Sequence, residues 1–209
     1  MQVLDQDSRQ WIAGGWLDEA ALAPLAELNS QCLELIADMA SCPGPTAFPV
    51  ARQIAALPAE ARASLAHAPY LLADAFFDDP LRWKTLAHWR VQDVPHDPSR
   101  HAFIGPQAAT FVRGVLVYGW HLARAHRQLA RVVLGMTPAC ANSIAALGLS
   151  DLHWACEHRP EWVSLRWEGR PQIWSQLLMA AQVGDRAAVR RASLRGIQLL
   201  GASALQRKG

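Results

Sequence analysis

The sequence predicts an all-helical protein built from two similar units in tandem. Apolar residues recur at three- and four-residue steps over long stretches, which is the spacing of a helix with one buried face. The stretch from 54 to 86 also returns between 144 and 178, and both copies open with Ile-Ala-Ala-Leu, at an offset of 90 residues that then becomes 91. The matching anchors at 91 are prolines, large aromatics and a leucine: Pro69 with Pro160, Phe76 with Trp167, Pro80 with Pro171, Trp83 with Trp174 and Leu86 with Leu177. A repeat of this length is nearer to a small domain than to a solenoid unit.

The chain divides at its clearest linker. Three prolines, a glycine and several polar residues fall between 91 and 106, a composition typical of a connecting segment. We therefore predict a first unit over residues 1–90, a linker over 91–106 and a second unit over 107–209 that includes a C-terminal helix. Two units in one chain make a built-in pseudo-dimer, and whether the chain also forms a homodimer is left open.

In the first unit, a long helix is predicted from about Asp18 to Ala40, followed by a breaker rich in proline and glycine. A short helix is expected over 48–57 and another from Pro58 to His67, because proline is favoured at the first helical position. Asp78-Asp79-Pro80 signals the start of a helix that continues through Trp83. We interpret Trp83 and its counterpart Trp174 as core residues.

In the second unit, a long helix is predicted over 108–133, with an apolar inner face. Thr137-Pro138 predicts the start of a helix, and Ser150 is expected to cap another over 151–158; with Gly148 between them, the pair has the outline of a helix-turn-helix. Residues 162–168 alternate with a period of two, which indicates an extended segment with Ser164, Arg166 and Glu168 on one side. This segment and its counterpart over 70–77 either pair into a small two-stranded ribbon or act as plain connectors. A last helix is expected over 185–200.

The charge is divided unequally along the chain. Residues 1–80 hold 11 acidic and 3 basic residues, a net charge of −8, while residues 81–209 hold 7 acidic and 17 basic ones, a net charge of +10. All but two of the 20 basic residues are arginine, which suits forked contacts to phosphate or carboxylate. Two interpretations stay open: the acidic and basic halves attract each other, or the basic half faces nucleic acid.

The sequence offers little for catalysis. Gly-x-Ser-x-Gly, Gly-x-x-x-x-Gly-Lys-Ser/Thr, Gly-x-Gly-x-x-Gly and His-Glu-x-x-His are all missing, so we predict no enzyme, no cofactor and no metal site. The apolar runs are shorter than the ~20 residues that a membrane-spanning helix requires, and the start of the sequence does not read as a signal peptide. We therefore expect a cytoplasmic protein. Its four cysteines are irregularly spaced, which favours reduced thiols.

Part of the second unit resembles a known family. The residues that carry the resemblance are Leu134-Gly135-Met136, Ala141, Ile144-Ala145-Ala146-Leu147, Leu149, Leu152, Glu157, Leu165-Arg166-Trp167-Glu168 and Ile173, with Glu27-Leu28-Asn29 and Phe76-Phe77-Asp78-Asp79 in the first unit. They are similar to FlhD, a subunit of the enterobacterial flagellar master regulator. The resemblance implies small helical units that dimerise and that work with a second subunit, FlhC, to bind promoter DNA. That family carries one unit per chain, whereas this chain carries two.

From the charge and the resemblance together we predict a transcription regulator or regulator partner. The acidic first unit would engage a protein such as an FlhC-like subunit, and the basic second unit would face DNA or a partner. The candidate binding residues are six arginines: Arg159, Arg166, Arg170, Arg190, Arg191 and Arg195. The alternative is an adaptor of a flagellar or type III secretion-type assembly that does not contact DNA.

Overall fold

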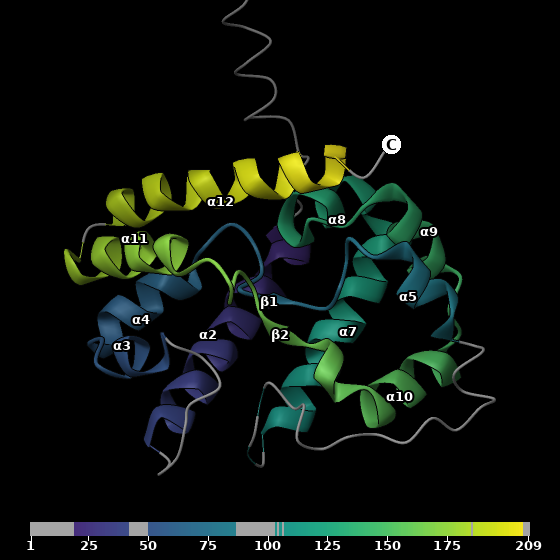
Figure 1. The fold of residues 1–209 in the computed structure, drawn as a ribbon, viewed down its shortest axis with the longest axis horizontal. Helices are drawn as coiled ribbons and strands as arrows, with labels where there is room; N and C mark the ends of the chain where they lie inside the picture. The colour runs from purple at the N-terminus through teal and green to yellow at the C-terminus, as the bar shows by residue number, and fades with distance from the viewer. Residues whose placement is uncertain are drawn as a thin grey trace, which may run out of the picture.

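The computed structural model describes residues 19–41, 50–86, 103, 105, 107–184 and 186–206 (Figure 1). The chain is mostly helical, as predicted. Its first half contains α2 (Glu19–Ser41), α3 (Ala51–Ala55), α4 (Ala59–Ala66), β1 (Ala73–Asp74) and α5 (Pro80–Lys84). Its second half contains α7 (Ala108–Ala125), α8 (Arg127–Leu134), α9 (Pro138–Ala145), α10 (Leu149–His158), the 3-10 turn η2 (Pro160–Trp162), β2 (Ser164–Leu165), α11 (Pro171–Gln182) and α12 (Arg186–Gln206). Of the predicted linker, only Phe103 and Gly105 fall within the described residues. None of the described helices has the length and apolarity that would let it cross a membrane.

Two helix starts follow their sequence signals, whereas Pro58 lies at the cap position of α4 and not at the first helical position predicted for it. The Asp79 carboxylate accepts a hydrogen bond from the Arg82 backbone N–H, and the Thr137 hydroxyl accepts one from Cys140, each with proline next in the chain. The prediction that Ser150 caps α10 is wrong. Gly148 holds the cap position, and its N–H donates to the Asp151 carboxylate at 3.1 Å, so the helix begins at Leu149.

The single helix predicted over 108–133 is broken in two. His126 leaves the helical conformation (φ −139°, ψ 58°) and separates α7 from α8. Neither proline nor glycine marks this position. The break turns α8 so that it packs against both α9 and α12, and its Leu129 and Val133 become buried.

A two-stranded antiparallel ribbon joins the halves, so of the two alternatives the paired one forms. Ala73 lies opposite Leu165 and Asp74 lies opposite Ser164. At the offset of 91 residues, Ala73 corresponds to Ser164 and Asp74 to Leu165. The pairing is therefore reciprocal, as across a two-fold axis.

Each strand leads into the same unusual turn. Phe76 and Trp167, which are 91 residues apart, are the two non-glycine residues with positive φ in the described chain, at 51° and 56°. In each case the carbonyl accepts a hydrogen bond from the N–H three residues on, Asp79 at 3.0 Å and Arg170 at 2.8 Å. Large side chains adopt this conformation only when their surroundings hold them in it. Both turns then lead to a helix that starts with proline.

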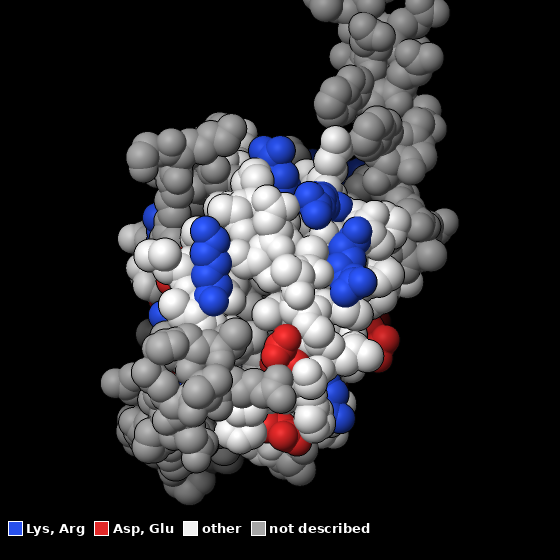
Figure 2. All heavy atoms as spheres, turned by 90° about the vertical axis from the view of Figure 1, so that its right-hand side faces the viewer, with Lys and Arg blue, Asp and Glu red and all other residues white. Residues whose placement is uncertain are grey.

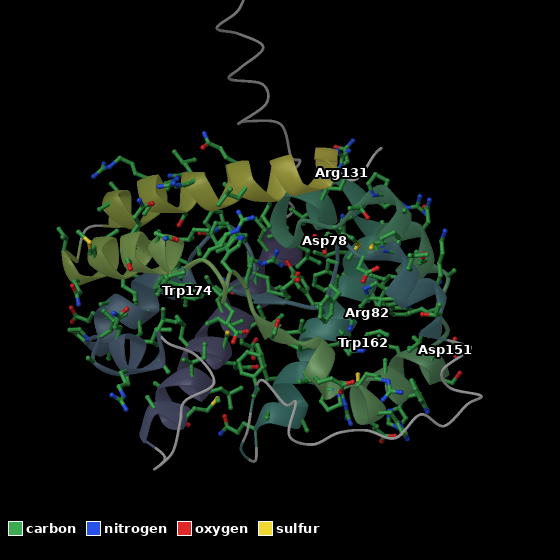
Figure 3. The ribbon with its side chains drawn as sticks, viewed as in Figure 1. Asp78, Arg82, Arg131, Asp151, Trp162 and Trp174 are labelled. Carbon is green, nitrogen blue, oxygen red and sulfur yellow. The ribbon has the colours of Figure 1, made fainter. Side chains whose placement is uncertain are left out.

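The two tryptophans that are 91 residues apart make similar hydrogen bonds. Trp83 and Trp174 are fully buried, and each donates its indole N–H to the turn before its helix, Trp83 to the Phe76 carbonyl at 3.0 Å and Trp174 to the Arg166 carbonyl at 2.8 Å. Trp174 is labelled in Figure 3. These hydrogen bonds fix the helices α5 and α11 to the ribbon. Of the other matched anchors, Leu86 and Leu177 are fully buried, Pro171 is exposed and the rest are partly buried.

The halves share one interior. The buried apolar side chains of both form a single cluster, because α11 packs on α4, α5 packs on α9, and α2 packs on α7. Within each half, two shorter helices pack on the long helix: α3 and α4 pack on α2, and α9 and α10 pack on α7.

Helix α12 has no counterpart among the helices described in the first half, and it approaches the ribbon through a glycine. A Cβ at Gly196 would lie 2.6 Å from the Trp167 and Tyr70 rings, whereas one at Gly201 would meet nothing within 4 Å. We expect Gly196→Ala to lower the unfolding free energy by about 1–3 kcal/mol, because two packed aromatic rings must move.

The matched control is Gly201→Ala in the same helix, which we expect to raise stability by about 0.5–1 kcal/mol through helix propensity. Urea unfolding curves measure both. Equal effects of the two substitutions would contradict the close contact at Gly196.

Candidate functional site

The structure separates the six predicted arginines into two groups. Arg159 and Arg166 are buried, with 4% and 5% of their surface exposed. The other four, Arg170, Arg190, Arg191 and Arg195, are exposed. The predicted phosphate-contacting face therefore loses its first two members.

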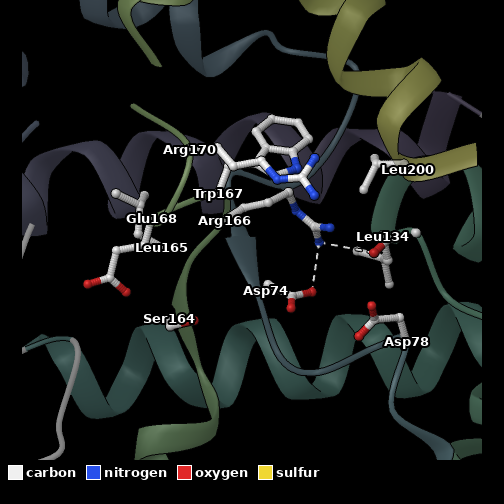
Figure 4. Close-up of a pocket in the computed structure, with 12 residues that line it drawn as sticks. Asp74, Asp78, Leu134, Ser164, Leu165, Arg166, Trp167, Glu168, Arg170 and Leu200 are labelled. Carbon is white, nitrogen blue, oxygen red and sulfur yellow. Dashed lines mark hydrogen bonds and ion pairs between the residues drawn. The ribbon is translucent and has the colours of Figure 1, made fainter. Parts of the chain in front are cut away.

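Arg166 lies at the centre of the molecule, where it links segments from both halves (Figure 4). Its Nε donates to the carbonyls of Leu71 at 2.7 Å and Ala73 at 3.2 Å. Its Nη2 donates to the carbonyls of Ala73 and Leu134, both at 3.0 Å, and lies 3.2 Å from the Asp74 Oδ1. The alternation in the sequence placed this side chain on the same side as Ser164 and Glu168, but β2 ends at Leu165 and the chain turns at Trp167.

Burial dominates the electrostatics of this cluster. It raises the pKa of Asp74; the Arg166 guanidinium opposes this shift, and the nearby Asp78 carboxylate adds to it. Burial likewise lowers the pKa of Arg166 in spite of the neighbouring carboxylates. The pair therefore satisfies backbone carbonyls at an electrostatic cost, which is the behaviour of a structural ion pair.

Arg159 is held in a second structural contact. Its Nη1 donates to the His158 carbonyl at 3.0 Å and lies 3.9 Å from the Glu161 carboxylate. Its guanidinium also lies over the Trp154 ring, 5.3 Å from the centroid. The Arg159 guanidinium thus holds the end of α10 in place and, because it is buried, is not available to bind a phosphate.

A cavity of about 420 Å³ opens beside the ribbon (Figure 4). Its ionisable lining comprises Asp74, Asp78, Glu168, Arg166 and Arg170. Burial raises the pKa of Glu168. Because the carboxylates and guanidiniums nearly balance, the cavity presents no strong field of either sign to a ligand.

The arginines of α12 form a candidate binding face. Arg190, Arg191 and Arg195 are exposed, and the Arg195 Nη1 donates to the Gln176 Oε1 of α11 at 3.1 Å. Exposed Leu194 lies among them in the sequence. The three arginines predicted on the last helix are therefore accessible, and their binding role stays a prediction.

Sequence reasoning missed a second basic face at the junction of α7 and α8. Arg124, Arg127 and Arg131 are all exposed and follow one another at steps of three and four residues. Arg124 lies 4.7 Å over the Trp120 ring, and the Arg127 Nη1 donates to the Asn142 Oδ1 at 3.0 Å. We call these three residues the α7–α8 arginine stripe. The signal was present in the spacing, but only the apolar face of this segment had been considered.

The α7–α8 arginine stripe lies in a region free of carboxylates. The sequence contains neither Asp nor Glu between Asp97 and Asp151, so α7, α8 and α9 carry four arginines and no acid. Figure 2 shows the side of the molecule that bears α8 and α9, where basic residues gather in the upper part and acidic residues lie below them.

Helices α9 and α10 are the pair predicted as a helix-turn-helix, and the second of them has few side chains that could recognise bases. The exposed His153 and Glu157 pair with each other, with 3.1 Å between Nε2 and Oε1. Asp151 is committed to the helix cap. These groups offer few of the donors that recognise base edges.

The long helix of the first half presents the opposite charge. Glu27, Glu34 and Asp38 are exposed on α2 at steps of seven and four residues, which places them on one face. Gln31 donates to Glu27 and Ser30 donates to Glu34, both at 3.2 Å. The first half therefore offers a carboxylate face.

No group of three or more His, Cys, Asp or Glu side chains in the described part of the chain is arranged to hold a metal ion. No family model matches the chain, and neither the curated proteins nor the solved structures give a match.

Proposed function

We propose that the chain is an FlhD-like regulator or regulator partner that acts by binding. Its two FlhD-like units would form a pseudo-dimer within one chain. The resemblance of the second half to FlhD and the reciprocal ribbon support this proposal. A pair of FlhD-like units held by one interior would present two different faces to two different partners.

The observation that carries the proposal is the opposite charge of the two long helical segments. α2 presents three exposed carboxylates, whereas α7 to α9 contain four arginines and no acid. Charge of one sign on each surface favours binding of oppositely charged groups and steers their approach. The acidic face suits a basic protein surface, such as one on an FlhC-like subunit, and the basic face suits DNA.

An electrophoretic mobility shift with duplex DNA tests the proposal over a range of salt concentrations. We expect the wild-type protein to retard the duplex at low salt and to lose affinity as salt rises, because binding releases cations from the DNA and this release is less favourable at higher salt. A protein that fails to bind at 50 mM salt would overturn the DNA role and favour the alternative, an adaptor in a flagellar or secretion-type assembly.

A further inference from the structure

The chain carries two exposed arginine faces, and they differ in what surrounds them. Leu194 lies among the α12 arginines in the sequence, and α11, which packs on α12, carries Met179 and Val183; these three apolar side chains are 54%, 66% and 74% exposed. Apolar residues ringed by charge are typical of protein interfaces. The α7–α8 arginine stripe has Gln128 within it and exposed Val132 next to Arg131, and α7, α8 and α9 contain no carboxylate.

The surroundings of the α7–α8 arginine stripe also hold its side chains in place. Trp120 supports the Arg124 guanidinium through a cation–π contact, while its own indole N–H donates to the Leu147 carbonyl at 3.0 Å. Asn142 of α9 orients Arg127 from the other side. An arginine that is already oriented loses less conformational entropy when it binds a phosphate.

A hollow of about 390 Å³ lies at the break between the two helices, lined by Arg124, Ala125, His126, Arg127, Gln128 and Leu129. Two guanidiniums and an amide thus border one depression. Guanidinium and amide N–H groups both donate to phosphate oxygens.

We infer that the α7–α8 arginine stripe is the surface through which the chain contacts the phosphate backbone of duplex DNA. This inference rests on the proposed function and adds to it the contact surface. The stripe lies on α7 and α8, outside the helix-turn-helix outline, so binding is backbone-directed and largely independent of base sequence. The α12 face serves a different partner.

The test compares two triple variants that remove the same charge from different faces. The first is Arg124→Gln, Arg127→Gln and Arg131→Gln; the matched control is Arg190→Gln, Arg191→Gln and Arg195→Gln. Binding to a fluorescein-labelled duplex of mixed sequence, followed by anisotropy, gives the affinity and its salt slope. Circular dichroism and thermal unfolding confirm that both variants are folded.

We expect the stripe variant to lose at least about tenfold in affinity at low salt, and its salt slope to fall by about 2.7, close to 0.9 for each phosphate contact removed. The control variant should keep the wild-type slope. Equal losses in the two variants, or a larger loss in the control, would overturn the inference while leaving the proposed function intact.

If the wild-type protein binds no DNA, the inference and the DNA role of the proposed function fall together. If the stripe variant loses binding to a polyglutamate peptide but retains binding to DNA, the stripe is a docking surface for acidic protein and the inference is wrong. Intact binding of both probes by the stripe variant would also overturn it.

Discussion

Arg166→Met is expected to lower the unfolding free energy by about 3–5 kcal/mol, the largest effect of any single substitution outside the apolar core. Methionine keeps much of the side-chain volume but donates no hydrogen bond. The carbonyls of Leu71, Ala73 and Leu134 would lose their side-chain donor, and Asp74 would be left as a partly buried charge without its partner. Chemical denaturation at neutral pH measures the change.

The substitution Asp74→Asn distinguishes the contribution of the ion pair to stability from that of the carbonyl contacts of Arg166. The amide oxygen of asparagine can still accept from Arg166, and no buried carboxylate remains, so we expect a change within about 1 kcal/mol. Because burial raises the pKa of Asp74 above its unfolded value, the wild type loses stability as the pH rises from about 4 through the raised pKa, and the variant lacks this loss. A loss as large as that of Arg166→Met would show that the charge, and not the carbonyl contacts, stabilises the ribbon.

Asn29→Leu is expected to cost about 3 kcal/mol or more. Asn29 is fully buried in α2, and its amide nitrogen donates to the Ala66 carbonyl at 3.1 Å and the Tyr70 carbonyl at 3.0 Å. Its Oδ1 accepts from the Leu72 N–H at 2.8 Å. One side chain therefore ties the long helix to the segment that enters β1, and leucine of similar size would leave these backbone groups without their partner.

Two further variants give this prediction its controls. Asn29→Asp keeps the acceptor for Leu72 but turns an anionic oxygen toward two carbonyls, so its loss should be at least as large at neutral pH and smaller in acid. Ser30→Ala on the same helix should cost no more than about 0.5 kcal/mol, because the Ser30 hydroxyl contacts only Glu34 at the surface. Similar losses for Asn29→Leu and Ser30→Ala would refute the role of the buried amide.

The sequence was sufficient for features that depend on local rules. Periodic apolar residues located the helices, and Asp79-Pro80 and Thr137-Pro138 located two helix starts. The alternating segment over 162–168 identified one of the two strands of the ribbon. Matching prolines and aromatics pointed to the tryptophans that anchor α5 and α11. The tandem origin of the halves stays a prediction.

Features that depend on the tertiary environment could not be predicted. Period-two alternation assumes an uninterrupted strand, but β2 has two residues and Trp167 adopts a positive φ, so Arg166 turns inward to carbonyls about 30 and 95 residues away in the chain. The break at His126 carries no proline or glycine and depends on how α8 packs. The α7–α8 arginine stripe and the lack of Asp and Glu between Asp97 and Asp151 were both readable from the sequence. The contacts that hold the stripe, Trp120 with Arg124 and Asn142 with Arg127, required the tertiary structure.

The covalent connection between the two halves contributes to the stability of their packing. Since α11 lies on α4 and α5 lies on α9, each half covers apolar surface of the other, much as two subunits do. The peptide between Leu86 and Phe103 then acts as a tether that holds the halves at an effective concentration in the millimolar range or above. Cut that peptide, and the same interface becomes a bimolecular association whose stability depends on dilution.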